Sequence, residues 1–141
     1  REIQMKAFLD TNVILDFYDS DRGHYQPAAI VFDLASRGEI EISVCALSFV
    51  TAFFLLHGKY DKSMLYEKMR ALFKLCHVTP VDKQIVEKAL SQERRDFEDA
   101  VQYFSCQTID ADIILTRDRK GFNDFAIPHL SPSDFLDDYL K

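Results

Sequence analysis

Short apolar runs alternate with longer amphipathic stretches along the whole chain. Residues 6–9 form a short bounded run, and residues 39–44 alternate polar with apolar side chains; both patterns are typical of buried strands. Apolar positions from Ala28 to Ala35 follow one helical face, between Pro27 as a start signal and Gly38 as a stop. The complete pattern predicts strands at residues 6–9, 39–44, 77–80, 112–116 and 125–130, and helices at residues 27–38, 43–56, 65–76, 82–90, 97–106 and 131–140.

The regular alternation of strands and helices predicts an α/β domain with a mainly parallel sheet, because parallel neighbours need helical crossovers. The 141 residues suffice for one domain with a sizeable core. We expect a single domain over residues 5–141, with Met5 as the natural start and residues 1–4 as a cloning remnant or N-terminal extension. The longest apolar stretch, residues 44–56, is too short and too often interrupted by Ser and Thr to span a membrane.

Four aspartates occur where a strand ends or a helix begins. Asp10 follows the first strand, Asp118 follows the fourth, and Asp96 and Asp99 lie three residues apart at the start of a helix. Ligands of parallel α/β sheets gather at the carboxyl ends of the strands. Asp10 and Asp118 would therefore share one edge if their strands are neighbours. Each aspartate alone also fits a turn or a cap, and Asp96 fits an N-cap especially well.

Several carboxylates without matching bases favour a bound cation, since they otherwise repel one another and raise their own pKa values. Mg²⁺ and Mn²⁺ prefer oxygen ligands. Such an ion can lower the pKa of an attacking water and stabilise charge on a phosphodiester, so the pattern suits phosphoryl chemistry. No glycine-rich phosphate loop and no G-x-S-x-G motif competes with it, and the four histidines are dispersed.

Net charge and cysteine usage bear on the binding partner and on the cellular compartment. The net charge of −6 argues against a general electrostatic nucleic-acid binder, but leaves open one whose acids surround a cation. The three cysteines lie far apart in apolar surroundings, which favours reduced thiols in a cytoplasmic protein.

Four segments carry a family resemblance: FLDTNVILD, DFEDAVQYFSC, ADIILTRDRKGF and IPHLSPSDFL, in this order over about residues 6–140. With them the chain resembles the PIN-domain family, including the VapC-type toxins of bacterial toxin-antitoxin pairs. The resemblance implies a three-layer α/β/α fold with a parallel sheet of order 3-2-1-4-5. It also implies a ribonuclease active site that depends on Mg²⁺ or Mn²⁺.

The same resemblance assigns roles to individual positions. Asp10, Asp99 and Asp118 match the catalytic metal ligands, and Asp96 matches an additional acid present in some members. The small polar positions beside the metal are Thr11, Asn12 and Thr116.

One position departs from the family pattern. Many PIN nucleases carry a glutamate on the helix after the second strand, where this chain has Thr51. A hydroxyl can bind a metal-held water, but it cannot replace the missing negative charge, so metal affinity should fall. Asp96 is the expected compensation, one helical turn from Asp99. The alternative is a catalytically weakened PIN-like module that binds RNA or a protein partner without cutting.

Substrate and partner contacts are expected beside this site. Arg117 is the foremost candidate for binding RNA phosphates, because its neighbour Asp118 is an expected ligand, although solvated surface charge is the plainer interpretation for most basic residues. The resemblance implies an antitoxin partner and a homodimer formed through the aromatic-rich residues 48–60. Burial of Phe53, Phe54 and Tyr60 within the monomer would remove the motive for that interface.

Overall fold

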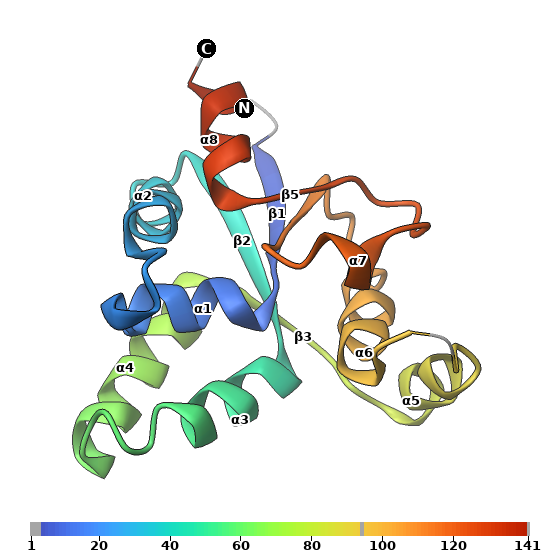
Figure 1. Cartoon of the computed structure of the whole chain (residues 1–141), viewed down its shortest axis with the longest axis horizontal. Coiled ribbons are helices and arrows are strands. Elements are labelled where there is room, and N and C mark those ends of the chain that lie inside the picture. Colours follow the sequence, from blue (N-terminus) through green and yellow to red (C-terminus); the bar gives the residue numbers. More distant parts are fainter. Residues whose placement is uncertain (1–3, 94, 141) are drawn as a thin grey trace.

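The computed structural model describes residues 4–93 and 95–140, whose five strands form one parallel sheet in the order β3-β2-β1-β4-β5 (Figure 1). The strands are β1 (Met5–Leu9), β2 (Ile40–Cys45), β3 (His77–Thr79), β4 (Ile113–Leu115) and β5 (His129–Leu130). The α/β class and the strand order are therefore confirmed. Because β1 lies in the centre, its carboxyl end meets those of β2 and β4, with Leu9 opposite Val44 and Leu115.

Helices cover both faces of the sheet and make the three expected layers (Figure 1). They are α1 (Thr11–Tyr18), the 3-10 helix η1 (Ser20–Arg22), α2 (Tyr25–Ser36), α3 (Ala46–Leu55), α4 (Lys62–Leu75), α5 (Lys83–Leu90), α6 (Phe97–Cys106), α7 (Arg119–Phe122) and α8 (Pro132–Tyr139). Ala7 and Leu9 of β1 point to the face covered by α1, α2, α3, α4 and α8. Phe8, between them, points to the face covered by α6 and α7, and α5 packs against α6.

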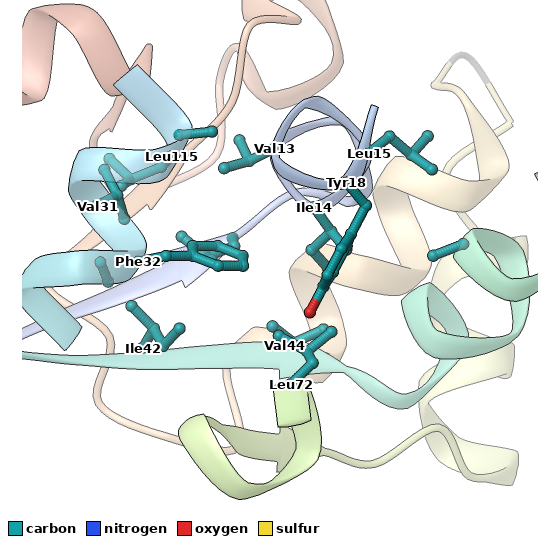
Figure 2. Close-up of a cluster of buried hydrophobic side chains, with 14 of the residues drawn as sticks. Val13, Ile14, Leu15, Tyr18, Val31, Phe32, Ile42, Val44, Leu72 and Leu115 are labelled. Carbon is teal, nitrogen blue, oxygen red and sulfur yellow. The ribbon is translucent and has the colours of Figure 1, made fainter. Parts of the chain in front are cut away.

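The larger core surrounds α1. Figure 2 shows Val13, Ile14 and Tyr18 of this helix against side chains of α2 and β2, including Phe32 and Val44. Burying an apolar side chain of this size contributes about 1.5–3 kcal/mol. This packing fixes α1 directly after β1, which holds the connecting residue, Asp10, at the sheet edge.

Three sequence predictions need correction. The apolar pattern gave no helix at residues 11–18, where α1 lies, nor at α7. The predicted helix at residues 43–56 starts too early: residues 43–45 complete β2, since they pair with β3 and, as far as Val44, with β1, and α3 begins at Ala46. Pro27 is not the first residue of α2, which begins at Tyr25; proline is tolerated in a first turn because its missing N–H needs no partner there.

The boundaries of the domain are only partly described. Residues 1–3, expected to lie outside the domain together with Gln4, and Lys141 fall outside the described residues. Within the described part of the chain, no helix is long and apolar enough to cross a membrane.

Candidate active site

Asp10 lies at the carboxyl end of β1, almost completely buried, with its carboxylate held from two neighbouring elements. Gln102 of α6 donates from Nε2 to Asp10 Oδ1 at 3.0 Å, and Thr116, just after β4, donates from Oγ1 to Oδ2 at 2.7 Å. Burial raises the pKa of Asp10, and these hydrogen bonds only partly oppose it. The carboxylate after β1 is thus oriented and buried, unlike that of a solvated turn residue.

Asp99 and Asp118 join Asp10 from two other segments. Asp99 is buried in the first turn of α6, whereas Asp118 is exposed at the start of α7. Burial raises the pKa of Asp99 to about 8, assisted by the charges of Asp10, Asp96 and Asp118 and by a hydrogen bond with Asp118. The expected convergence of these aspartates is therefore observed.

Gly121 makes room for two of these carboxylates. A β-carbon on it would lie 1.9 Å from Asp99 Oδ2 and 3.0 Å from Asp118 Oδ2. Its amide also donates to Asp118 Oδ1 at 3.2 Å. Any larger residue at position 121 would have to displace the Asp99 carboxylate. This role cannot be predicted from the sequence, because a glycine in a charged loop carries no signal of what packs against it.

A cleft of about 780 Å³ opens beside the carboxylates. Its lining includes Asp96, Asp99 and Asp118 together with two basic residues, Arg95 and Lys120. The guanidinium of Arg95 lies 4.0 Å from the centre of the Phe125 ring and donates to the Asn123 carbonyl at 2.6 Å. Acidic groups at one place and basic groups on the walls are the arrangement that a phosphodiester next to a cation requires.

Comparison with known proteins shows the family of the chain. The sequence profile described as "PIN domain" matches residues 6–120. The chain belongs to the PIN-domain family. It is 27% identical over 125 residues to the curated "Ribonuclease VapC1" of Aquifex aeolicus (strain VF5), covering 84% of this chain and 85% of that protein.

Solved structures share the fold of this PIN domain at low identity. A toxin-antitoxin complex from Klebsiella pneumoniae matches with a TM-score of 0.66 and 14% identity, over 89% of this chain and 97% of that chain. VapBC2 from Rickettsia felis, bound to a DNA fragment from its promoter, matches with a TM-score of 0.67 and 12% identity, over 90% of this chain and 98% of that chain. Mycobacterium tuberculosis VapC20, described as a Sarcin-Ricin loop cleaving toxin, matches with a TM-score of 0.66 and 13% identity, over 83% of this chain and 95% of that chain.

Thr51, the departure from the family pattern, faces a different acid of the PIN domain. Its Oγ1 donates to Glu98 Oε2 at 3.2 Å, and Glu98 is half-buried. Burial raises the pKa of Glu98, and the charges of Asp10 and Asp96 add to this effect. Asp96, the expected compensation, is exposed and caps α6 by accepting from the Asp99 amide at 3.1 Å. Glu98 is not among the site residues predicted from the sequence.

The predicted small polar positions have unequal surroundings. Thr116 bonds Asp10 directly, whereas the hydroxyl of buried Thr11 pairs with Ser48 Oγ at 2.6 Å. Asn12 approaches Asp10 Oδ2 only at 3.4 Å through its Nδ2. Gln102, which the sequence analysis missed, has a signal in helical spacing, since it lies one turn after Asp99 on the same face.

Arg117, the predicted phosphate-binding residue, is held by an acid on α1. Its Nε and Nη2 donate to the two oxygens of Asp16 at 2.7 and 3.0 Å, and Arg22 Nε donates to Asp16 Oδ1 at 2.9 Å. Asp16 is 1% exposed, so this ion pair ties α1 to the segment after β4. A role for Arg117 in substrate binding stays a prediction.

The donor set fits a hard divalent cation in its chemistry. Within residues 4–93 and 95–140, no three acidic, histidine or cysteine side chains form a ready-made metal-binding group. The Asp99 and Asp118 carboxylates do lie close together, since a β-carbon on Gly121 would come within 1.9 Å of Asp99 Oδ2 and 3.0 Å of Asp118 Oδ2. The charge of Asp118 adds to the burial that raises the pKa of Asp99. A cation between these carboxylates would relieve the repulsion and meet the oxygen ligands that Mg²⁺ and Mn²⁺ prefer.

Proposed function

We propose that this PIN domain is an endoribonuclease that depends on Mg²⁺ or Mn²⁺, and the toxin of a toxin-antitoxin pair. One observation carries the proposal: Asp10, Asp99 and Asp118 come together from three separate segments, and the charges of Asp10 and Asp118 add to the burial that raises the pKa of Asp99 to about 8. Similarity to a curated ribonuclease supports the choice of RNA as substrate.

Each residue of the site has a defined task in this proposal. Asp10, Asp99 and Asp118 would hold the ion, which when bound supplies positive charge to a phosphodiester and to its attacking water. Gln102 and Thr116 keep the Asp10 carboxylate in one orientation, because each donates to a different oxygen. Hydrolysis adds the water oxygen to phosphorus and breaks a P–O ester bond; a carboxylate of the cleft accepts the proton of the water, and the leaving ribose oxygen takes up a proton from the solvent.

Basic residues would guide the RNA backbone. Lys120 is exposed and lines the cleft with Arg95, so both can meet phosphates next to the acids. Arg117 already donates to Asp16 and would contribute less directly.

An exposed apolar strip on α3 supports the proposed partners. Phe54 is 77% exposed, and Val50 and Leu55 beside it are also exposed, whereas Phe53 and Tyr60 pack against the core. We propose that this strip contacts a second copy of the chain or an antitoxin, in keeping with the toxin-antitoxin complexes among the structural relatives. Phe53 and Tyr60 are therefore not part of the proposed interface.

The alternative is a PIN module that binds RNA or a protein without cutting, and its motive is Thr51. Calorimetric titration with Mn²⁺ separates the two candidates. Retained RNA affinity without any Mn²⁺ binding in the millimolar range would favour the silent module.

The direct test is cleavage of single-stranded RNA with Mn²⁺ by the wild type, Asp10→Asn and Asp137→Asn. Asp137 is an exposed aspartate on α8, away from the site, so its variant should cut like the wild type. Asp10→Asn should lower the rate by at least about 100-fold, which corresponds to about 2.7 kcal/mol of lost transition-state stabilisation. Equal rates for Asp10→Asn and the wild type would reject the assignment.

A further inference from the structure

The side chain of Glu98 faces the active site from α6 and has no role in the functions assigned above. Two side-chain hydrogen bonds, called cross-links below, connect α3 with α6 near Asp10. Ser48 Oγ lies 3.5 Å from Gln102 Oε1, and Thr51 Oγ1 lies 3.2 Å from Glu98 Oε2. Each helix contributes residues one turn apart, so the two cross-links lie one above the other. Since Gln102 bonds Asp10, Glu98 lies next to that bond on the same helical face.

The charge of Glu98 is poorly compensated. No lysine or arginine among residues 4–93 and 95–140 forms an ion pair with it, and within the same residues its side chain accepts a hydrogen bond from the neutral hydroxyl of Thr51. It is half-buried close to Asp10 and Asp96, which carry charge of the same sign. A carboxylate withdrawn from water beside other carboxylates is costly unless a cation joins them.

We propose that Glu98, oriented by Thr51, supplies a fourth carboxylate to the divalent cation held by Asp10, Asp99 and Asp118. The proposal rests on the proposed function and assigns the compensation for Thr51 to Glu98 rather than to Asp96. Asp96 instead caps α6 and positions the amide of Asp99. In this arrangement the negative charge reaches the ion from α6, and α3 contributes only the hydroxyl that orients it.

A structural alternative makes different predictions. Glu98 lies in the first turn of α6, where any acid stabilises the helix through its interaction with the backbone dipole. In that case Glu98→Gln would lower the thermal stability slightly and leave metal affinity unchanged. In our proposal, the same variant weakens metal binding and relieves repulsion in the metal-free protein.

The experiment is calorimetric titration of the RNA-free protein with Mn²⁺. Glu98→Gln should raise the Kd about tenfold or more. Glu87→Gln, an exposed acid on α5, is the matched control and should bind like the wild type. Adding Thr51→Glu to Glu98→Gln places a carboxylate on the other side of the same cross-link and should restore most of the affinity. Circular dichroism verifies that each variant is folded.

The outcomes separate this inference from the proposed function. If Asp10→Asn abolishes Mn²⁺ binding while Glu98→Gln stays within twofold of the wild type, Glu98 is not part of the metal site and the nuclease proposal stands. If the wild type itself does not bind Mn²⁺, both proposals fall. Glu98→Gln could also weaken binding without recovery in the double variant that adds Thr51→Glu. That result would show that a carboxylate at position 51 cannot replace the one at position 98, and it would overturn the idea that Glu98 compensates for Thr51.

Discussion

At position 121 the absence of a side chain decides where a carboxylate lies. Gly121→Ala should push the Asp99 carboxylate away, since the new β-carbon would lie 1.9 Å from Oδ2. We expect Mn²⁺ affinity and RNA cleavage to fall about tenfold or more. The free energy of unfolding should change by less than about 1 kcal/mol, because the displaced group is the end of a side chain.

Gly58→Ala is the control for this substitution. Its new β-carbon would have no atom within 4 Å, so affinity and cleavage should match the wild type. Titration with Mn²⁺ and urea unfolding of both variants measure the two effects separately. A Gly121→Ala variant that binds and cuts normally would show that the Asp99 carboxylate is not needed where it lies.

Sequence position identified those site residues that owe their place to the end of a strand or the start of a helix. Asp10, Asp99 and Asp118 were predicted in this way, and the structure brings them together. Glu98 and Gly121 were not predicted, because what places them beside these aspartates is contact with segments at distant positions in the chain. Glu98 meets Thr51 across two helices, 47 residues apart. No local pattern reports such a contact.

At the scale of elements, α1 was not predicted although its residues are mostly buried. The segment follows Asp10 with Thr and Asn and contains β-branched Val13 and Ile14, all weak helix formers. An isolated helix of eight residues is marginal in water. The core in Figure 2 stabilises it instead, and this tertiary contribution is invisible in local propensity.

The ion pair between Asp16 and Arg117 attaches α1 to the segment after β4. Asp16→Asn would leave Arg22 and Arg117 without their counter-charge. Breaking a fully buried pair costs about 3–5 kcal/mol. Since the two arginine side chains are 32% and 30% exposed, we expect a loss nearer to about 2 kcal/mol in the free energy of unfolding, measured by urea denaturation.

A matched control lies on α2. Asp33 pairs with Arg37 at 3.0 Å, but both side chains are more than half exposed. Asp33→Asn should therefore cost less than about 0.5 kcal/mol. Similar losses for Asp16→Asn and Asp33→Asn would mean that the buried pair does not fix α1.

At the scale of the whole molecule, alternation of strands and helices was enough to predict the parallel α/β class, whereas the order 3-2-1-4-5 came from the family resemblance and is confirmed. Alternation alone does not say on which face each helix packs. In the structure, α6 and α7 pack on the face opposite α1, and this brings Asp99 and Asp118 to Asp10 from the other side of the sheet.

Association of the molecule should depend on the exposed strip of α3. Phe54→Asp places a charge on a side chain that is 77% exposed, so the monomer should fold normally. Because a charge cannot be buried cheaply in an apolar contact, the variant should lose the proposed dimer. Sedimentation at increasing concentration compares the two, with Ile30→Asp on exposed α2 as the control. Identical sedimentation of wild type and Phe54→Asp would remove this strip from any contact between copies.

The clustered acids should also make the stability of the metal-free protein depend on pH. The pKa of Asp99 rises from 3.8 to about 8 on folding, and the pKa values of Asp10 and Glu98 rise as well. Between these pKa values the folded protein binds protons that the unfolded chain has released. The free energy of unfolding must therefore fall as pH increases through this range.

Asp99→Asn tests this linkage, because an amide holds no titrating proton. In urea unfolding with a chelator present, the wild type should lose stability from pH 5 to pH 9 more steeply than Asp99→Asn, and the variant should be the more stable protein at pH 9. Saturating Mn²⁺ should reverse the order, since an ion that binds the folded wild type more tightly stabilises it by mass action. Parallel pH profiles for the two proteins without metal would mean that the Asp99 carboxyl group is ionised in the folded protein at neutral pH, contrary to the crowding of acids from which the metal site is inferred.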